Sequence, residues 1–249
     1  MKQTVVMPCH KRIEMLALSL ESLERTNEEL DVRIFLDTAT PERLDEVEYV
    51  RDTFYPEALI FHARPHIQAP SGMYNILNAL KQGLKWGGEL IYIVEEDVVV
   101  RPDFFQWHQQ AQKQGNFLAT CGRRIPNLPN YNQYTNPGSC FSKDKLELVC
   151  SYITDDLFKA PREHMDRVFG KHDEVSDLDD GLVRRIAITH NLSVLYPDVP
   201  KCSHIGFVAY NRYFGWVNEG DIKTRIENLR KMLPTVDRKN KYTSDFEPI

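Results

Sequence analysis

The chain has 249 residues, of which 42% are hydrophobic and 27% are charged, and this suits one large α/β domain or two small ones. No apolar run approaches the ~18 residues that a membrane-spanning helix needs, and the N-terminus has no apolar signal region, which predicts a cytoplasmic protein. A net charge of −5 argues against a surface built to bind nucleic acid. The five cysteines form no CxxC pair and are odd in number, which favours reduced thiols.

Strands and helices alternate along the first hundred residues. The predicted strands are 4–8, 32–37, 58–63 and the run that begins at 89, and the predicted helices between them are 11–26, 40–54 and 71–87. Thr40 and Pro41 suit the N-cap and the first position of the second helix, and a Gly-Gly pair ends the third. This alternation predicts an α/β fold with a mostly parallel, Rossmann-like central sheet flanked by helices. Its ligand crevice is expected beyond the carboxyl ends of the strands.

The fourth strand is the most informative, because its apolar run ends in three acids in ELIYIVEEDVVVRPDFF, residues 89–105. Side chains alternate faces along a strand, so Glu95 and Asp97 are expected to point the same way and Glu96 the opposite way. Two carboxylates on one face at the carboxyl end of a strand indicate a hard divalent cation that holds a phosphate-bearing substrate. The alternative is a solvated acidic turn before the Pro-led helix 103–114.

Three further features are expected at the same edge of the sheet. His10 and Arg12 follow the first strand, where an Arg can form a fork onto phosphate oxygens. Asp37 ends the second strand and suits a hydrogen bond from a ribose or a base. The acids of SDLDDGLVRRI, residues 176–186, precede a helical stretch, which they would also stabilise as caps. A strand at 116–122 and a long loop rich in Pro, Asn and Tyr at 123–139 complete the pattern.

Five segments occur in the order and spacing of one known group. IVEEDVVVRPDFF resembles a strand that ends in an acidic triplet of the EDD kind before a Pro-Asp-Phe-Phe turn, TVVMPCHKR resembles a first strand with a phosphate-side Arg, and RIFLDTATPE resembles a second strand with a uridine-contacting Asp. DLDDGLVR resembles an Asp-Asp-x-x-x-Arg segment that bears a catalytic base, and LYPDVPKCSHIGFVAYNRYFG resembles a Pro-Glu-x-Ser-Arg region with a following Phe-Gly. These are features of nucleotide-sugar glycosyltransferases of the GT-A fold, and the chain is most similar to the N-acetylglucosaminyltransferase I group. It departs from that group at Lys201, which replaces an Arg, at Gly181, which replaces an aromatic residue, and in lacking a secretory anchor.

The resemblance implies an inverting, metal-dependent transfer of a sugar, GlcNAc or glucose, from a UDP-sugar to a hydroxyl group. It also implies one GT-A-like domain over 1–249, with a nucleotide-sugar-binding half at 1–114 and a half at 115–249 that binds the acceptor and supplies the catalytic base. Asp97, with His204, would bind Mn²⁺ or Mg²⁺, although a lone His also suits a purely structural hydrogen bond. Asp179 or Asp180 would be the base, and sequence spacing accommodates either. The residues assigned to the donor are Pro8, His10, Arg12, Asp37, Glu95 and Glu96.

The acceptor stays open between a glycan, a small molecule, a protein and a hydroxymethylated base in phage DNA, which would place the enzyme in a bacterium or a phage-infected cell. One alternative function is a nucleotidyltransferase acting on a sugar phosphate, but MPCHKR lacks the glycine of a phosphate-binding loop. The other alternative is a non-catalytic protein that binds sugar nucleotides.

Overall fold

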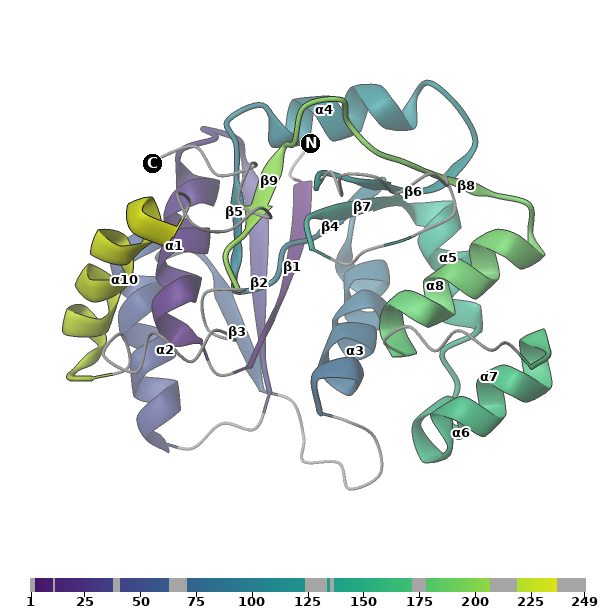
Figure 1. Ribbon diagram of the computed structural model, residues 1–249, viewed down its shortest axis with the longest axis horizontal. Coiled ribbons are helices and arrows are strands. Elements are labelled where there is room, and N and C mark those ends of the chain that lie inside the picture. Colours follow the sequence, from purple (N-terminus) through teal and green to yellow (C-terminus); the bar gives the residue numbers. More distant parts are fainter. Residues whose placement is uncertain are drawn as a thin grey trace.

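A mixed seven-stranded sheet runs through the molecule, with helices on both of its faces (Figure 1). The computed structural model describes residues 3–10, 12–37, 41–62, 71–123, 134, 137–171, 178–206 and 219–236. The strand order is β3-β2-β1-β4-β7-β6-β8. The strands are β1 (Gln3–Cys9), β2 (Leu30–Leu36), β3 (Leu59–His62), β4 (Leu90–Ile93), β6 (Phe117–Cys121), β7 (Ser139–Ser142) and β8 (Ser193–Leu195). All neighbouring strands are parallel except the two pairs that include β7.

The helices divide between the two faces of this sheet (Figure 1). On one side lie α1 (Ile13–Glu24), α2 (Pro41–Phe54) and α10 (Ile222–Val236). On the other lie α3 (Ser71–Trp86), α5 (Lys143–Ser151), α6 (Asp155–Lys159), α7 (Pro161–Phe169) and α8 (Leu178–Thr189). The helix α4 (Phe104–Gln112) packs on the same face as α1, over β4 and β6. No helix in these described ranges is both long and apolar enough to cross a membrane.

Alternation of side chains along the central strands builds a hydrophobic core on each side of the sheet. Tyr92 in β4 packs into the core beside α1 and α2, and its neighbours Ile91 and Ile93 pack into the core beside α3, α5 and α8. All three side chains are fully buried. The prediction of a central strand covered on both faces is therefore confirmed, as is the mostly parallel α/β sheet.

The second half of the chain differs from the simple alternation. The antiparallel strand β7 and the helices α5, α6 and α7 were not predicted from the sequence, because β7 is only four residues long and has no clear pattern. Most of the loop predicted at 123–139 lies outside the described residues. A separate two-stranded antiparallel sheet joins β5 (Val98–Val100), directly after the acids, to β9 (Cys202–His204). None of the five cysteines is in a disulfide, as the sequence predicts.

Candidate functional site

The three acids lie in a turn rather than in a strand. Strand β4 ends at Ile93, and the backbone N–H of Val98 donates to the carbonyl of Glu95 at 3.1 Å. The regular alternation of a strand does not extend through such a turn. The prediction that Glu96 points away from Asp97 is therefore wrong, because both carboxylates reach the same cation.

That cation is Arg12, which lies between the end of β1 and the start of α1. Its Nε donates to Oε1 of Glu96 at 3.1 Å, and its Nη1 lies 2.5 Å from Oδ2 of Asp97. Asp97 is completely buried, whereas 22% of the Arg12 side chain is exposed. The guanidinium thus joins the β1 end to the acidic turn and neutralises part of its charge.

The three acids differ in how readily they ionise. Burial, and then the charges of Asp97 and Glu96, hold the pKa of Glu95 well above its usual value. Burial and the charge of Asp97 raise the pKa of Glu96 to about 7, although Arg12 opposes this shift. For Asp97 burial acts in the same direction, but His204 and Arg12 outweigh it, so its pKa is lowered. Asp97 is therefore the acid of this turn that ionises most readily, and a carboxylate must be ionised to bind a hard cation.

His204 reaches Asp97 from a distant part of the sequence. Strand β9 pairs with β5 so that His204 is opposite Val98, and the N–H of Ile205 donates to the Asp97 carbonyl at 2.8 Å. Nε2 of His204 lies 2.9 Å from Oδ2 of Asp97. A Cβ at Gly206 would overlap that same carboxylate oxygen, so only glycine fits there. Sequence reasoning missed Gly206, although a glycine two residues after a candidate ligand could have drawn attention to it.

The chemistry of this pair fits a divalent cation. Oδ1 of Asp97 is buried and has no hydrogen-bond partner within the described residues, which is costly unless another ligand satisfies it. A carboxylate oxygen and an imidazole nitrogen suit Mn²⁺ and, less well, Mg²⁺. Among the residues that the structure describes, no three His, Cys, Asp or Glu side chains gather as a metal site. A cation here would need oxygens from a substrate to complete its coordination.

The residues that the sequence assigns to the nucleotide lie at the ends of β1 and β2. Asp37 directly follows β2, is almost completely buried, and has Oδ2 at 3.0 Å from Nδ1 of His10. Its backbone N–H donates to the carbonyl of Cys9 at 2.9 Å. The carbonyl of Pro8 accepts a hydrogen bond from the N–H of Glu96 at 3.2 Å, so Pro8 links β1 to the acidic turn. All these residues therefore converge on one edge of the sheet, as predicted.

Asn75 on α3 supports this edge and was missed by the sequence analysis. Its Nδ2 donates to the carbonyl of Phe35 at 2.7 Å and approaches that of Cys9 at 3.3 Å, and so connects the ends of β2 and β1. The side chain is buried. Its only sequence signal is a polar residue among the apolar positions of an amphipathic helix.

The two candidate bases lie in the first turn of α8. Asp179 is 9% exposed, and Asp180 is half-buried. The charges of both raise the pKa of Glu95, so the start of α8 lies close to the acidic turn. Asp177 lies outside the described residues. That either residue is the catalytic base stays a prediction.

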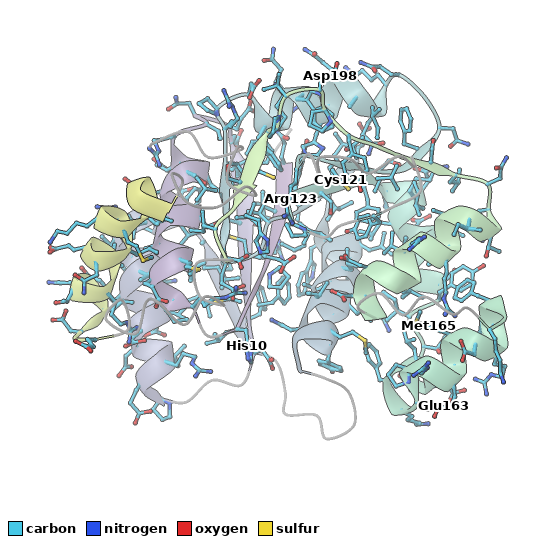
Figure 2. All side chains as sticks on the ribbon, in the orientation of Figure 1. His10, Cys121, Arg123, Glu163, Met165 and Asp198 are labelled. Carbon is cyan, nitrogen blue, oxygen red and sulfur yellow. The ribbon has the colours of Figure 1, made fainter. Side chains whose placement is uncertain are left out.

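Two cationic residues from the second half of the chain contact Asp103 and His204. Lys201, which replaces the Arg of the group that the sequence resembles, lies with Nζ 2.5 Å from Oδ2 of Asp103 and so stabilises the turn before α4. Arg123 follows β6, and its Nη1 lies 3.5 Å from Nδ1 of His204. Figure 2 shows Arg123 near the middle of the molecule, well separated from His10 at the end of β1. Sequence analysis did not single out Arg123.

No model of a protein family matches the chain, and no curated protein matches its sequence. Solved structures do match. A mannosyltransferase from Pyrobaculum calidifontis, solved with GDP-Man and Mn²⁺, aligns with a TM-score of 0.55 at 15% identity over 100% of this chain and 68% of its own. Residues 1–349 of TarS from S. aureus align with a TM-score of 0.53 at 16% identity over 97% of this chain and 73% of theirs.

The galactosyltransferase LgtC, in complex with donor and acceptor sugar analogues, aligns with a TM-score of 0.51 at 12% identity, over 78% of this chain and 72% of its own. These identities are too low to transfer an activity, but the shared architecture is clear. The central strand order and the mixed sheet flanked by helices place this chain in the GT-A fold.

Proposed function

We propose that the protein is a metal-dependent inverting glycosyltransferase that moves a sugar, GlcNAc or glucose, from a UDP-sugar to a hydroxyl acceptor. The observation that carries the proposal is the Asp97–His204 pair, at 2.9 Å, which β5 and β9 bring together beside Arg12. A GT-A fold with a buried carboxylate of lowered pKa at this edge suits a nucleoside diphosphate and its cation.

Each residue has a distinct task in the proposed reaction. A cation held by Asp97 and His204 would supply Lewis acidity that stabilises the departing diphosphate. Arg12, already placed between Glu96 and Asp97, would donate to a phosphate oxygen. Asp37 and His10 would hold the nucleoside, and Glu95 would accept hydrogen bonds from the ribose or from water on the cation.

The acceptor hydroxyl must lose its proton as it attacks an oxocarbenium-like carbon. A carboxylate on the far side of the sugar can accept that proton, as in inverting glycoside hydrolysis. Asp179 and Asp180 are the candidates, because the first turn of α8 lies near the acidic turn yet belongs to the half assigned to the acceptor. The acceptor itself stays open between a glycan, a small molecule, a protein and a hydroxymethylated DNA base.

The proposal is tested with Asp97→Asn and the control Asp52→Asn, which alters an exposed carboxylate on α2. The measured quantity is UDP release from UDP-GlcNAc and UDP-glucose with Mn²⁺ and a panel of acceptors. We expect the wild type and Asp52→Asn to turn over one donor, and Asp97→Asn to lose this activity while it keeps its circular dichroism spectrum. Full activity of Asp97→Asn, or a product of retained anomeric configuration in proton NMR, would refute the proposed mechanism.

A further inference from the structure

Arg123 lies beside the imidazole ring of His204, the proposed nitrogen ligand of the cation. A guanidinium only donates hydrogen bonds, so Nη1 of Arg123, 3.5 Å from Nδ1 of His204, can bond to that nitrogen only while Nδ1 carries no hydrogen. The ring hydrogen then lies on Nε2, which donates to Oδ2 of Asp97 at 2.9 Å. In this arrangement Nε2 has no lone pair to offer a cation.

For Nε2 of His204 to bind a cation, its hydrogen must move to Nδ1, where it would face Arg123. Two donors cannot share this contact, so the guanidinium cannot keep Nδ1 of His204 as an acceptor when the cation binds. Asp97 and His204 supply two ligands to a cation, and oxygens of water or of the substrate would complete its coordination. The group that brings those oxygens, a diphosphate, is itself a strong acceptor for a guanidinium.

The position of Arg123 along the sheet indicates which phosphate it would meet. Asp37 follows β2, Arg12 follows β1 and Asp97 follows β4, so these residues occupy neighbouring strand ends in that order. Arg123 follows β6, two strands beyond β4, and β6 runs parallel to β4 because both are antiparallel to β7. A donor with its nucleoside at Asp37 would therefore place its distal phosphate on the Arg123 side of Asp97.

The backbone before Arg123 is held firmly. The N–H of Gly122 donates to the carbonyl of Gly138 at 2.7 Å, and the carbonyl of Gly122 accepts from the N–H of Lys201 at 2.7 Å. A Cβ at Gly122 would approach the Phe104 ring to 2.7 Å, so the chain here is closely packed. The half-buried side chain of Arg123 therefore extends from a fixed backbone towards His204.

We infer that Arg123 binds the distal phosphate of the donor's diphosphate and leaves His204 as the cation and diphosphate bind. This inference rests on the proposed function. Arg12 would contact the phosphate nearer the nucleoside, and Arg123 the phosphate that carries the sugar. The charge that develops on the distal phosphate as the sugar departs would then meet a guanidinium in addition to the cation.

The test is calorimetric binding of UDP, GDP, UMP and GMP in the presence of Mn²⁺ to the wild type, Arg123→Gln, Arg123→Lys and the control Arg162→Gln. Arg162 is exposed on α7, so its variant removes the same charge away from the site. We expect Arg123→Gln to bind the preferred diphosphate about 10- to 100-fold more weakly, as for a lost charge-assisted hydrogen bond. Its affinity for the monophosphate should stay within about twofold of the wild type. The affinity of Arg123→Lys for the diphosphate should lie between those of the wild type and Arg123→Gln. The affinity of Arg162→Gln should match that of the wild type.

A second measurement separates a phosphate contact from general support of the site. Electron paramagnetic resonance of free Mn²⁺ gives the affinity for the metal alone, which Arg123→Gln should leave unchanged or tighten, since it removes the donor facing Nδ1. Equal weakening of diphosphate and monophosphate, no weakening of either, or a parallel loss of Mn²⁺ affinity would each overturn the role of Arg123. A wild type that binds neither diphosphate with Mn²⁺ would overturn the proposed function as well.

Discussion

Asp179 and Asp180 are the two candidates for the proposed catalytic base, and Asp179 is the more buried of the two. We expect one of Asp179→Asn and Asp180→Asn to bind UDP and Mn²⁺ normally but to lose transfer by about 10²- to 10⁴-fold, the range for a missing general base. The other should mainly reduce stability, because an acid in the first turn of α8 interacts favourably with the helix dipole. Single-turnover kinetics and calorimetry on both variants separate these effects. Unchanged transfer by both would remove the base from this segment.

Gly206 lies so close to the carboxylate of Asp97 that there is no room for a side chain at this position. We expect Gly206→Ala to weaken Mn²⁺-dependent UDP binding strongly, because its Cβ would overlap the Asp97 carboxylate and crowd Arg12. The control is Gly72→Ala, since a Cβ at Gly72 on α3 meets nothing within 4 Å. That control should be neutral or more stable by about 0.5–1 kcal/mol. Equal UDP affinities of the two variants in calorimetry would contradict this prediction, because the backbone at Gly206 could then move to accommodate a Cβ.

At the scale of elements, α3 holds together the ends of β1 and β2 through Asn75. Asn75→Ala should reduce the free energy of unfolding by about 1–3 kcal/mol, because the buried hydrogen bonds from this side chain to the carbonyls of Phe35 and Cys9 are lost. Asn78→Ala is the matched control on the same helix, because the described structure contains no hydrogen bond from the side chain of Asn78. Urea unfolding of both variants gives the comparison. If Asn75→Ala lost no more free energy of unfolding than Asn78→Ala, the stabilising role of Asn75 would be contradicted.

The elements of the nucleotide half could be read from the sequence because their signals are local. Asp37 and Asp97 each follow a run of apolar residues, and parallel alternation brings such strand ends to one edge without knowledge of distant contacts. The pairing of β9 with β5 has no such local signal, since three-residue strands about a hundred positions apart carry almost no pattern. The direction of Glu96 was mispredicted for a related reason: a turn, rather than the strand, sets the direction of its side chain. Arg123 and Asn75 have roles that depend on partners far away in sequence.

At the scale of the whole molecule, His108 links stability to pH. The ring lies in the core on α4, with Nδ1 at 2.6 Å from Oγ1 of Thr120, and burial lowers the pKa of His108 from 6.5 to about 3. Between these values the unfolded chain binds a proton that the folded chain does not, so stability is full above about pH 6.5 and falls as the pH decreases. The contribution of this one group amounts to roughly 2 kcal/mol between about pH 6.5 and pH 5, since each unit is worth about 1.4 kcal/mol.

The measurement is urea unfolding from pH 5 to pH 7 for the wild type, His108→Gln and His190→Gln. His190 is exposed on the surface beside Tyr152, so its variant should keep the wild-type dependence on pH. His108→Gln should be less stable at pH 7 yet show a shallower loss on acidification, because it has no imidazole to protonate on unfolding. Parallel curves for all three proteins would show that other groups govern the response to acid.

The short ladder between β5 and β9 also has a consequence for the newly made protein. The strands β1 to β4, with Asp37, Arg12 and the acidic turn, are complete once the first hundred residues have left the ribosome, but His204 and Gly206 are synthesised much later. A nascent chain can therefore assemble strands β1 to β4 while Asp97 still lacks its partner His204. The order of synthesis itself delays the contact between Asp97 and His204 until β9 has been made.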